Sequence, residues 1–179
     1  MNLFQALQLT LDDLHEDLAV CSGQRSWLYL PPCLLHPGFQ VSFFYRWARF
    51  WHWLKLGFMA KLATAAGRLF NGCDVHYQAE IDAGVQFPHG RGVVIGAGVV
   101  VGRRCYIFHN TTLGAREGVE GAPVLHEGVN IYPGTVIAGA VVVGEYCRIG
   151  PNVYLTESVA SHTRVRPAPA HIAPPHAKI

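Results

Sequence analysis

The sequence has little excess of either charge. Fourteen lysines and arginines stand against twelve aspartates and glutamates, which gives a formal net charge of +2. Such a balance argues against a nucleic-acid-binding protein, which usually carries a basic patch. No apolar stretch reaches the roughly 18 uncharged residues that a membrane-spanning helix needs. We therefore expect a soluble protein whose partners are small molecules, with no nucleic acid and no transmembrane segment.

Cysteine is sparse and irregularly placed. The five cysteines are odd in number, include no C-x-x-C pair and lie mostly among apolar neighbours: Cys21, Cys33, Cys73, Cys105 and Cys147. Neither a disulfide framework nor a zinc knuckle is expected from this pattern. The N-terminal stretch contains Asp12 and Asp13 but no early lysine or arginine, unlike a secretory signal peptide. These features predict a location in the reducing cytoplasm.

A six-residue repeat dominates the second half of the chain. An aliphatic residue recurs every six positions, at Ile95, Val101, Ile107, Leu113, Leu125, Ile131, Ile137, Val143, Ile149 and Leu155. Neither the 3.6-residue period of a helix nor the two-residue period of a strand explains this spacing. A hexapeptide period is typical of a parallel β-helix, in which three short strands and three corners make one coil of about eighteen residues. We predict a β-helix over residues 72–161.

Two interruptions break the repeat. Val75, Ile81 and Phe87 keep the six-residue spacing, but the step from Phe87 to Ile95 is eight, so two extra residues are expected to bulge out at "PHGRG". Residues 114–124, "GAREGVEGAPV", are rich in glycine and charge and predict a protruding loop. An interruption of this kind is either tolerated surface variation or a functional feature, and the chemistry of its residues distinguishes the two.

Helices are expected before the repeat. Residues 2–20 and residues 37–70 have apolar residues at helical spacing, the second segment with a break near Gly57. We predict a helical cap over residues 1–71 that packs beneath the first coil. Residues 166–179, "RPAPAHIAPPHAKI", are rich in proline and continue neither pattern. We treat residues 162–179 as a C-terminal tail.

Four segments resemble a known family. "HPGF...YRWARFWHWL", "DVH...FPHGRGVVIG", "TLGA" and "SHTRVRPAPAHI" are similar to the left-handed β-helix acyltransferases, and within them to the serine acetyltransferase-like branch. The similarity spans about residues 36–172. It implies a mainly β fold of left-handed hexapeptide coils, acetyl-CoA as co-substrate, direct transfer without a covalent enzyme intermediate, and a homotrimer with active sites between neighbouring subunits.

The resemblance also implies roles for individual residues. His89 matches the family's catalytic base and Asp74 its partner acid; the two are fifteen residues apart, close to one coil, which would allow them to stack on adjacent coils. An imidazole can take the proton of an acceptor hydroxyl, and a carboxylate behind it stabilises the imidazolium. Gly114 and Ala115 match the turn whose N–H meets the thioester. The tail segment of residues 162–179 would lie on the cofactor side, where coenzyme A phosphates are expected to bind Arg148, Thr163, Arg164 and Arg166.

Four charged partners of a free amino acid are missing. Residues 23–38 contain no acid, Pro88 precedes His89, and Gly121 and Ala122 stand where the family has an Arg-His pair. A zwitterion buried without partners costs several kcal/mol. The residues found instead, Trp27, Tyr29, Pro88, Arg91 and His109, predict a larger, less charged acceptor, namely a sugar, a polysaccharide unit or a natural-product hydroxyl. Arg91 and His109 would supply its hydrogen bonds. The alternative is a true serine O-acetyltransferase of cysteine biosynthesis.

Further departures and other classes of function remain open. Pro133 occupies a turn where the family usually has alanine, and its missing N–H removes one possible cofactor contact. A metal enzyme of the γ-carbonic anhydrase kind could use His76, His89, His109 and His126, but no two of these lie at that family's spacing, so no metal is expected. A non-catalytic β-helix scaffold is the other alternative.

Overall fold

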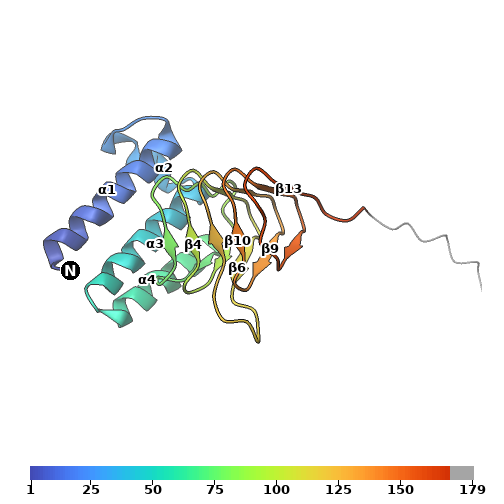
Figure 1. Ribbon diagram of the computed structural model, residues 1–179. Helices are drawn as coiled ribbons and strands as arrows, with labels where there is room; N and C mark the ends of the chain where they lie inside the picture. Colours follow the sequence, from blue (N-terminus) through green and yellow to red (C-terminus); the bar gives the residue numbers. More distant parts are fainter. Residues whose placement is uncertain (170–179) are drawn as a thin grey trace, which may run out of the picture.

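The protein is a three-sided β-helix with helices packed across one end (Figure 1). The computed structural model describes residues 1–169. Within this range, no helix is both long enough and apolar enough to cross a membrane. The left-handed β-helix with N-terminal helices was expected from the hexapeptide period and the family resemblance, and it is confirmed.

The first helix is delimited by its own sequence. Helix α1 (Leu3–Ser22) begins after Asn2, whose side chain accepts a hydrogen bond from the Gln5 N–H, while the Gln5 side chain accepts one from the Asn2 N–H. This reciprocal arrangement satisfies two N–H groups that the first turn of a helix leaves free. The helix ends at Gly23, which adopts a φ of 72°, as is common at helix C-termini.

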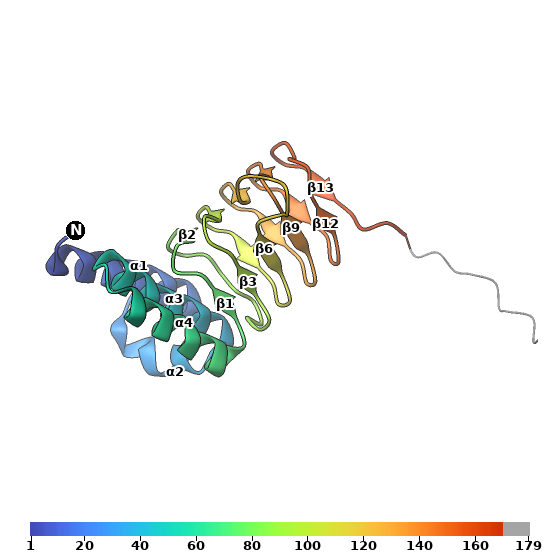
Figure 2. The same cartoon turned by 90° about the horizontal axis from the view of Figure 1, so that it is seen from below.

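The segment expected to be one interrupted helix forms two. Helix α3 (Pro37–Trp53) and helix α4 (Gly57–Asn71) are separated by a short turn in which Lys55 has a φ of 61°. The break expected near Gly57 is therefore confirmed. The short elements η1 (Trp27–Tyr29) and α2 (Leu30–Leu34) connect α1 to α3. Figures 1 and 2 show α1, α3 and α4 at the N-terminal end of the coils.

Thirteen short strands make the three faces of the coil. Each face is a parallel sheet, which we call sheets A, B and C, in the orders β1-β3-β6-β9-β12, β2-β4-β7-β10 and β5-β8-β11-β13. The strands are β1 (Asp74–Val75), β2 (Glu80–Ile81), β3 (Val94–Ile95), β4 (Val100–Val101), β5 (Tyr106–Ile107), β6 (Thr112–Gly114), β7 (Val124–Leu125), β8 (Asn130–Ile131), β9 (Val136–Ala138), β10 (Val142–Val143), β11 (Arg148–Ile149), β12 (Tyr154–Leu155) and β13 (Arg164–Val165).

The strand register locates both interruptions of the repeat. Val94 of β3 pairs with Thr112 of β6, one regular coil further on. Asp74 pairs with Val94 at a separation of twenty residues, which accommodates the two extra residues of the bulge before β3. Thr112 pairs with Val136 at a separation of twenty-four, because the loop between β6 and β7 adds six residues. Figure 1 shows this loop projecting from the coils.

The six-residue repeat builds the core of the β-helix. All ten aliphatic residues of the repeat are buried, the most exposed being Leu155 at 8%. Because alternate side chains of a strand point to opposite faces, one residue of each short strand points into the coil and its neighbour points out. Burying each Val, Ile or Leu contributes about 1.5–3 kcal/mol. The coils are therefore held by stacked aliphatic side chains.

Candidate active site

The predicted bulge forms a sharp corner between sheets C and A. Gln86 forms a bridge with Tyr106 of sheet C, and β3 of sheet A begins at Val94. At the corner, His89 is exposed and its backbone adopts a φ of 57°. This left-handed conformation is uncommon for residues other than glycine, although histidine adopts it more readily than most. The bulge thus displays an imidazole outward from the coil.

The start of helix α3 is wedged against the bulge. A Cβ atom placed on Gly38 would lie 2.3 Å from the Phe87 carbonyl oxygen, and one placed on Gly90 would lie 2.9 Å from Val41 Cγ2 and 3.1 Å from Gly38 Cα. Only glycine permits two backbone segments to come so close. The close contact fixes the bulge relative to α3.

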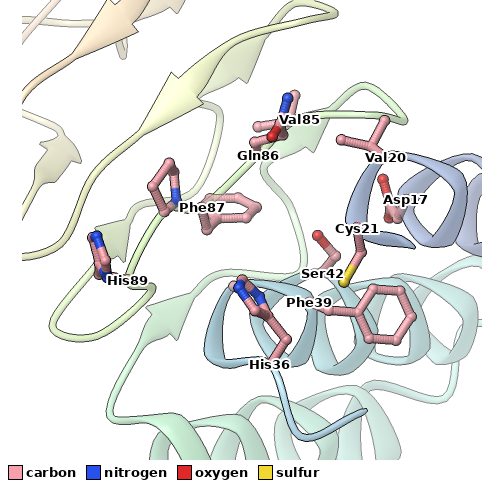
Figure 3. A pocket seen from close by; sticks show the side chains of 12 residues that line it. Asp17, Val20, Cys21, His36, Phe39, Ser42, Val85, Gln86, Phe87 and His89 are labelled. Atoms are coloured by element: carbon pink, nitrogen blue, oxygen red, sulfur yellow. The ribbon is translucent and has the colours of Figure 1, made fainter. Parts of the chain in front are cut away.

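A cavity of about 260 Å³ opens beside His89. Its walls come from three places: Asp17 and Cys21 of α1, Phe39 and Ser42 of α3, and residues 85–89 of the bulge segment. Figure 3 shows His89 at one side of this cavity and Asp17 at the opposite side. Burial and the neighbouring Cys33 raise the pKa of the Cys21 thiol to about 12, so at neutral pH this thiol is not a nucleophile.

A buried ion pair ties the helices to the first coil. The Arg46 guanidinium donates to Asp17 at 2.9 Å and to the carbonyl oxygens of Ile81 and Asp82 at 2.6 and 2.9 Å, and Asp17 accepts from the Gly84 N–H at 2.8 Å. A second carboxylate, Asp13, lies 3.3 Å from Arg46. Burial opposes the charge of Arg46, but Asp17 and Asp13 outweigh it and raise the pKa of the guanidinium. Asp17 lines the cavity, and the carboxylates of Asp13, Asp17 and Asp82 outnumber the guanidinium groups of Arg46 and Arg49 around this end.

Asp74 lies at the first coil but does not contact His89. Its N–H donates to the Val93 carbonyl oxygen at 2.9 Å, and its carboxylate lies 3.5 Å from Arg68 Nη1. Among residues 1–169, no hydrogen bond or ion pair joins Asp74 to His89. The partnership of the two residues stays a prediction.

His109 lies next to His89. The two rings are 6.0 Å apart between centroids and meet edge to face. The Nδ1 atom of His109 is buried and has no hydrogen-bond partner within the described part of the chain. Arg91 is exposed on the same corner, and its carbonyl oxygen accepts from the Asn110 N–H at 2.9 Å. The structure thus places both predicted acceptor residues on the corner that carries His89, the predicted base, but neither is among the described residues that line the cavity.

Of the other residues predicted to contact the acceptor, one lines the cavity and two lie away from it. Pro88 lines the cavity beside His89. Trp27 instead stacks on His15 at 5.2 Å between ring centroids, and Tyr29 ends the short helix η1. Of the described residues, those lining the cavity do not include either aromatic ring.

The predicted thioester turn and His89 flank neighbouring strands of sheet A at opposite strand ends. Gly114 ends β6, and Ala115 follows it, exposed, at the start of the protruding loop. His89 instead precedes β3, the neighbour of β6 in the same sheet. Within one chain, the predicted base and the predicted thioester turn therefore lie on opposite sides of the β3–β6 strand pair.

The predicted phosphate-binding residues come together at the C-terminal coils. Arg148 pairs with Arg164 on neighbouring strands of sheet C, and the Arg148 N–H donates to the Thr163 carbonyl oxygen at 2.9 Å. Arg166 follows directly after β13 and is exposed. Four strand spacings separate the coil of Gln86 from β13, about 19 Å along the axis. Pro133 forms part of a corner, where its carbonyl oxygen accepts from the Asn152 N–H at 2.9 Å. Residues 170–172 of the resemblance, and the tail beyond Pro169, lie outside the described residues.

The four histidines of the metal alternative do not form a metal site. Within residues 1–169, no three His, Cys, Asp or Glu side chains are grouped so that they could hold a metal ion. His76 stacks on Tyr77 and accepts at Nδ1 from the Gln78 N–H at 3.1 Å. Burial lowers the pKa of His76, although the nearby Asp74 opposes this effect.

Comparisons with known proteins agree with the fold. The family model "Bacterial transferase hexapeptide (six repeats)" matches residues 122–157. A serine acetyltransferase of Helicobacter pylori strain J99 is 34% identical over 155 residues, which cover 85% of this chain and 87% of that protein. The chain belongs to the serine acetyltransferase family. This family consists of left-handed β-helix acyltransferases that are CoA-dependent O-acetyltransferases, with acetyl-CoA as co-substrate.

Other family members are longer than this chain. The plasmid-encoded serine acetyltransferase of Synechococcus elongatus is 34% identical over 135 residues, but these cover 69% of this chain and only 42% of that protein. Among solved structures, the soybean serine acetyltransferase apoenzyme has a TM-score of 0.82 and 26% identity, covering 95% of this chain and 71% of that one. The Neisseria gonorrhoeae enzyme in complex with serine has a TM-score of 0.81 and 25% identity, covering 94% and 72%.

The sequence analysis did not predict that Asp17 and His36 line the cavity. Asp17 reaches the cavity from α1, sixty-seven residues before its hydrogen-bond partner Gly84. His36 reaches it from the residue that precedes α3. Asp17 lies before residues 23–38, the segment in which an acid was expected, and the sequence carries no local signal that α1 folds back onto the first coil.

Proposed function

We propose that this chain is a serine O-acetyltransferase, which transfers the acetyl group of acetyl-CoA to the hydroxyl of L-serine. The match to serine acetyltransferases over most of the chain carries the proposal. The expected sugar or natural-product acceptor has no support among these relatives, and the alternative of a true serine O-acetyltransferase is better supported. The relative from Neisseria gonorrhoeae has been described with serine bound.

The size of the cavity supports a small acceptor. At about 260 Å³ it lies below the roughly 300–1,000 Å³ of pockets for drug-sized ligands. A single amino acid suits this volume better than a polysaccharide unit does. Asp17 supports the same conclusion, because it supplies an acid at the cavity that residues 23–38 lack.

The chemistry follows from the position of His89. The unprotonated imidazole takes the proton of the serine hydroxyl while the serine oxygen attacks the carbonyl carbon of the thioester. The tetrahedral intermediate then collapses, its C–S bond breaks, and the imidazolium returns the proton to the departing coenzyme A sulfur. The Ala115 N–H would stabilise the negative oxygen of the intermediate. Asp74 would stabilise the imidazolium, as in the family pattern.

The active site would be completed between subunits of a homotrimer. His89 and Ala115 stand at opposite ends of sheet A, so the two can flank one thioester only if they come from different chains. Coenzyme A would then extend along the coils toward Arg148, Thr163, Arg164 and Arg166, whose positively charged side chains suit its phosphates. The five free cysteines of the chain support a location in a reducing compartment such as the cytoplasm.

The acceptor can be tested by measuring coenzyme A release from acetyl-CoA with L-serine, D-glucose and N-acetylglucosamine at equal concentrations, with product masses determined in parallel. We expect saturable release with L-serine and a product heavier by one acetyl group. Faster release with a neutral sugar than with L-serine would contradict the proposal. Absence of release with every acceptor would favour the scaffold alternative.

A further inference from the structure

One side chain at the cavity has no structural task assigned to it. His36 directly precedes α3 as its N-cap residue, yet its side chain makes no capping hydrogen bond. The imidazole is exposed to the cavity, and Figure 3 shows it rising from the start of α3 on the side of the cavity where His89 lies.

The position of His36 is fixed by the glycine contact of α3. Gly38 is so close to the Phe87 carbonyl oxygen that its missing Cβ would lie 2.3 Å from it, and the same Cβ position lies 3.4 Å from His36 Cε1. His36 is therefore held within a few ångströms of the bulge that carries His89. A ligand whose hydroxyl reaches His89 has its other groups within reach of His36.

The two ends of the cavity differ in electrostatic character. Around the α1 end, the carboxylates of Asp13, Asp17 and Asp82 outnumber the guanidinium groups of Arg46 and Arg49. At the other end, the N-terminus of the 17-residue helix α3 contributes a partial positive charge, and His36 adds an N–H donor or a full charge. Such a cavity suits a molecule with an ammonium group at one end and a carboxylate at the other.

We propose that His36 binds the carboxylate of the amino-acid acceptor and so determines the specificity of the enzyme for it. The inference rests on the proposed function, in which the acceptor is L-serine. In this arrangement, the hydroxyl points to His89, the ammonium group to the Asp17 end, and the carboxylate to His36. His36 thereby replaces the Arg-His pair that the protruding loop lacks at Gly121 and Ala122.

The test compares two acceptors in three main proteins, to which a rescue variant, His36→Lys, is added. Ethanolamine is serine without its carboxylate, so it reports on every contact except the one assigned to His36. The proteins are the wild type, His36→Leu and, as a matched control, His126→Leu, which removes an exposed histidine from the β-helix outside the cavity. The readouts are kcat and KM for each acceptor, KM for acetyl-CoA and the melting temperature.

We expect His36→Leu to raise KM for L-serine about 10-fold to 100-fold, because the variant loses a hydrogen bond to a charged group. Its kcat, its KM for acetyl-CoA and its KM for ethanolamine should stay within about twofold of the wild type. His36→Lys, which restores a cation, should recover part of the preference for L-serine. His126→Leu should behave as the wild type.

The outcomes separate the inference from the proposed function. A wild type that prefers L-serine, together with a His36→Leu variant that keeps the same preference over ethanolamine, overturns the role of His36 alone. A wild type that uses ethanolamine as readily as L-serine also overturns the role of His36 alone, because the carboxylate is then not recognised, whereas a wild type that uses neither acceptor overturns both. If His36→Leu raises KM for both acceptors equally, the residue shapes the cavity and does not recognise the carboxylate.

Discussion

His89 combines an unusual backbone with an exposed imidazole. Its φ of 57° places it in the left-handed region, where a residue other than glycine is destabilised by about 1–2 kcal/mol. The packing of the bulge against Gly38 holds the residue in this conformation. The backbone that carries the imidazole is thus fixed before an acceptor binds, which suits the role proposed for His89 as a general base.

Replacing His89 with alanine should lower kcat about 10²-fold to 10⁴-fold, because the variant lacks the group that takes the proton. The melting temperature should stay close to that of the wild type, since the side chain is exposed. Asp74→Asn should lower kcat less, because the acid stabilises the imidazolium without transferring the proton. Steady-state kinetics and thermal unfolding check these expectations, and a His89→Ala variant with wild-type kcat would show that the base has been misassigned.

Helix α3 determines where the bulge and the cavity lie. Its first turn contacts the bulge through Gly38 and Gly90, and Arg46, further along the helix, binds the carbonyl oxygens of Ile81 and Asp82 just before the bulge. Helix α1 is joined to the same place by the ion pair of Asp17 with Arg46. The helical cap thus covers the first coil and also supplies part of the wall of the cavity beside His89.

Gly38→Ala should destabilise the protein and lower kcat. The added Cβ would lie 2.3 Å from the Phe87 carbonyl oxygen, so α3 and the bulge must move apart, at a cost of about 1–3 kcal/mol. Gly57→Ala is the matched control, because a Cβ at the start of α4 meets no atom within 4 Å and alanine favours a helix. Urea unfolding and steady-state kinetics measure both variants. Equal stability of the two alanine variants would be inconsistent with a tight α3 contact.

The three faces of the β-helix differ in what they present outward. Sheet B presents three valines outward beside Glu80, namely Val100, Val124 and Val142. Sheet A presents a mixed set, Asp74, Val94, Thr112, Val136 and Tyr154. Sheet C instead presents Tyr106, Asn130, Arg148 and Arg164. An apolar face such as that of sheet B favours burial against other subunits. Sheets A and B meet at the corner that carries Ala115.

A homotrimer predicts complementation between two inactive variants. Light scattering should give a mass three times the 19.7 kDa of the chain. His89→Ala lacks the base, and Ala115→Pro lacks the N–H that would stabilise the oxyanion. When the two are unfolded together and refolded as mixed trimers, some sites should combine an intact His89 from one chain with an intact Ala115 from another, and activity should return. Activity no higher than that of the separate variants would place the whole site within one chain.

The spacing of residues along the chain was sufficient to predict the coil, because each strand is only two or three residues long and its inward residue follows from local geometry. The same spacing located the bulge and the loop, since each adds residues that the register must accommodate. The acceptor cavity could not be predicted in this way. Asp17 and His36 reach it through the packing of helices on the first coil, and this packing depends on shape, a buried ion pair and a glycine contact between segments far apart in sequence. Because residues 23–38 contain no acid, the sequence predicted a less charged acceptor. In the folded chain, the preceding helix α1 places Asp17 at the cavity instead.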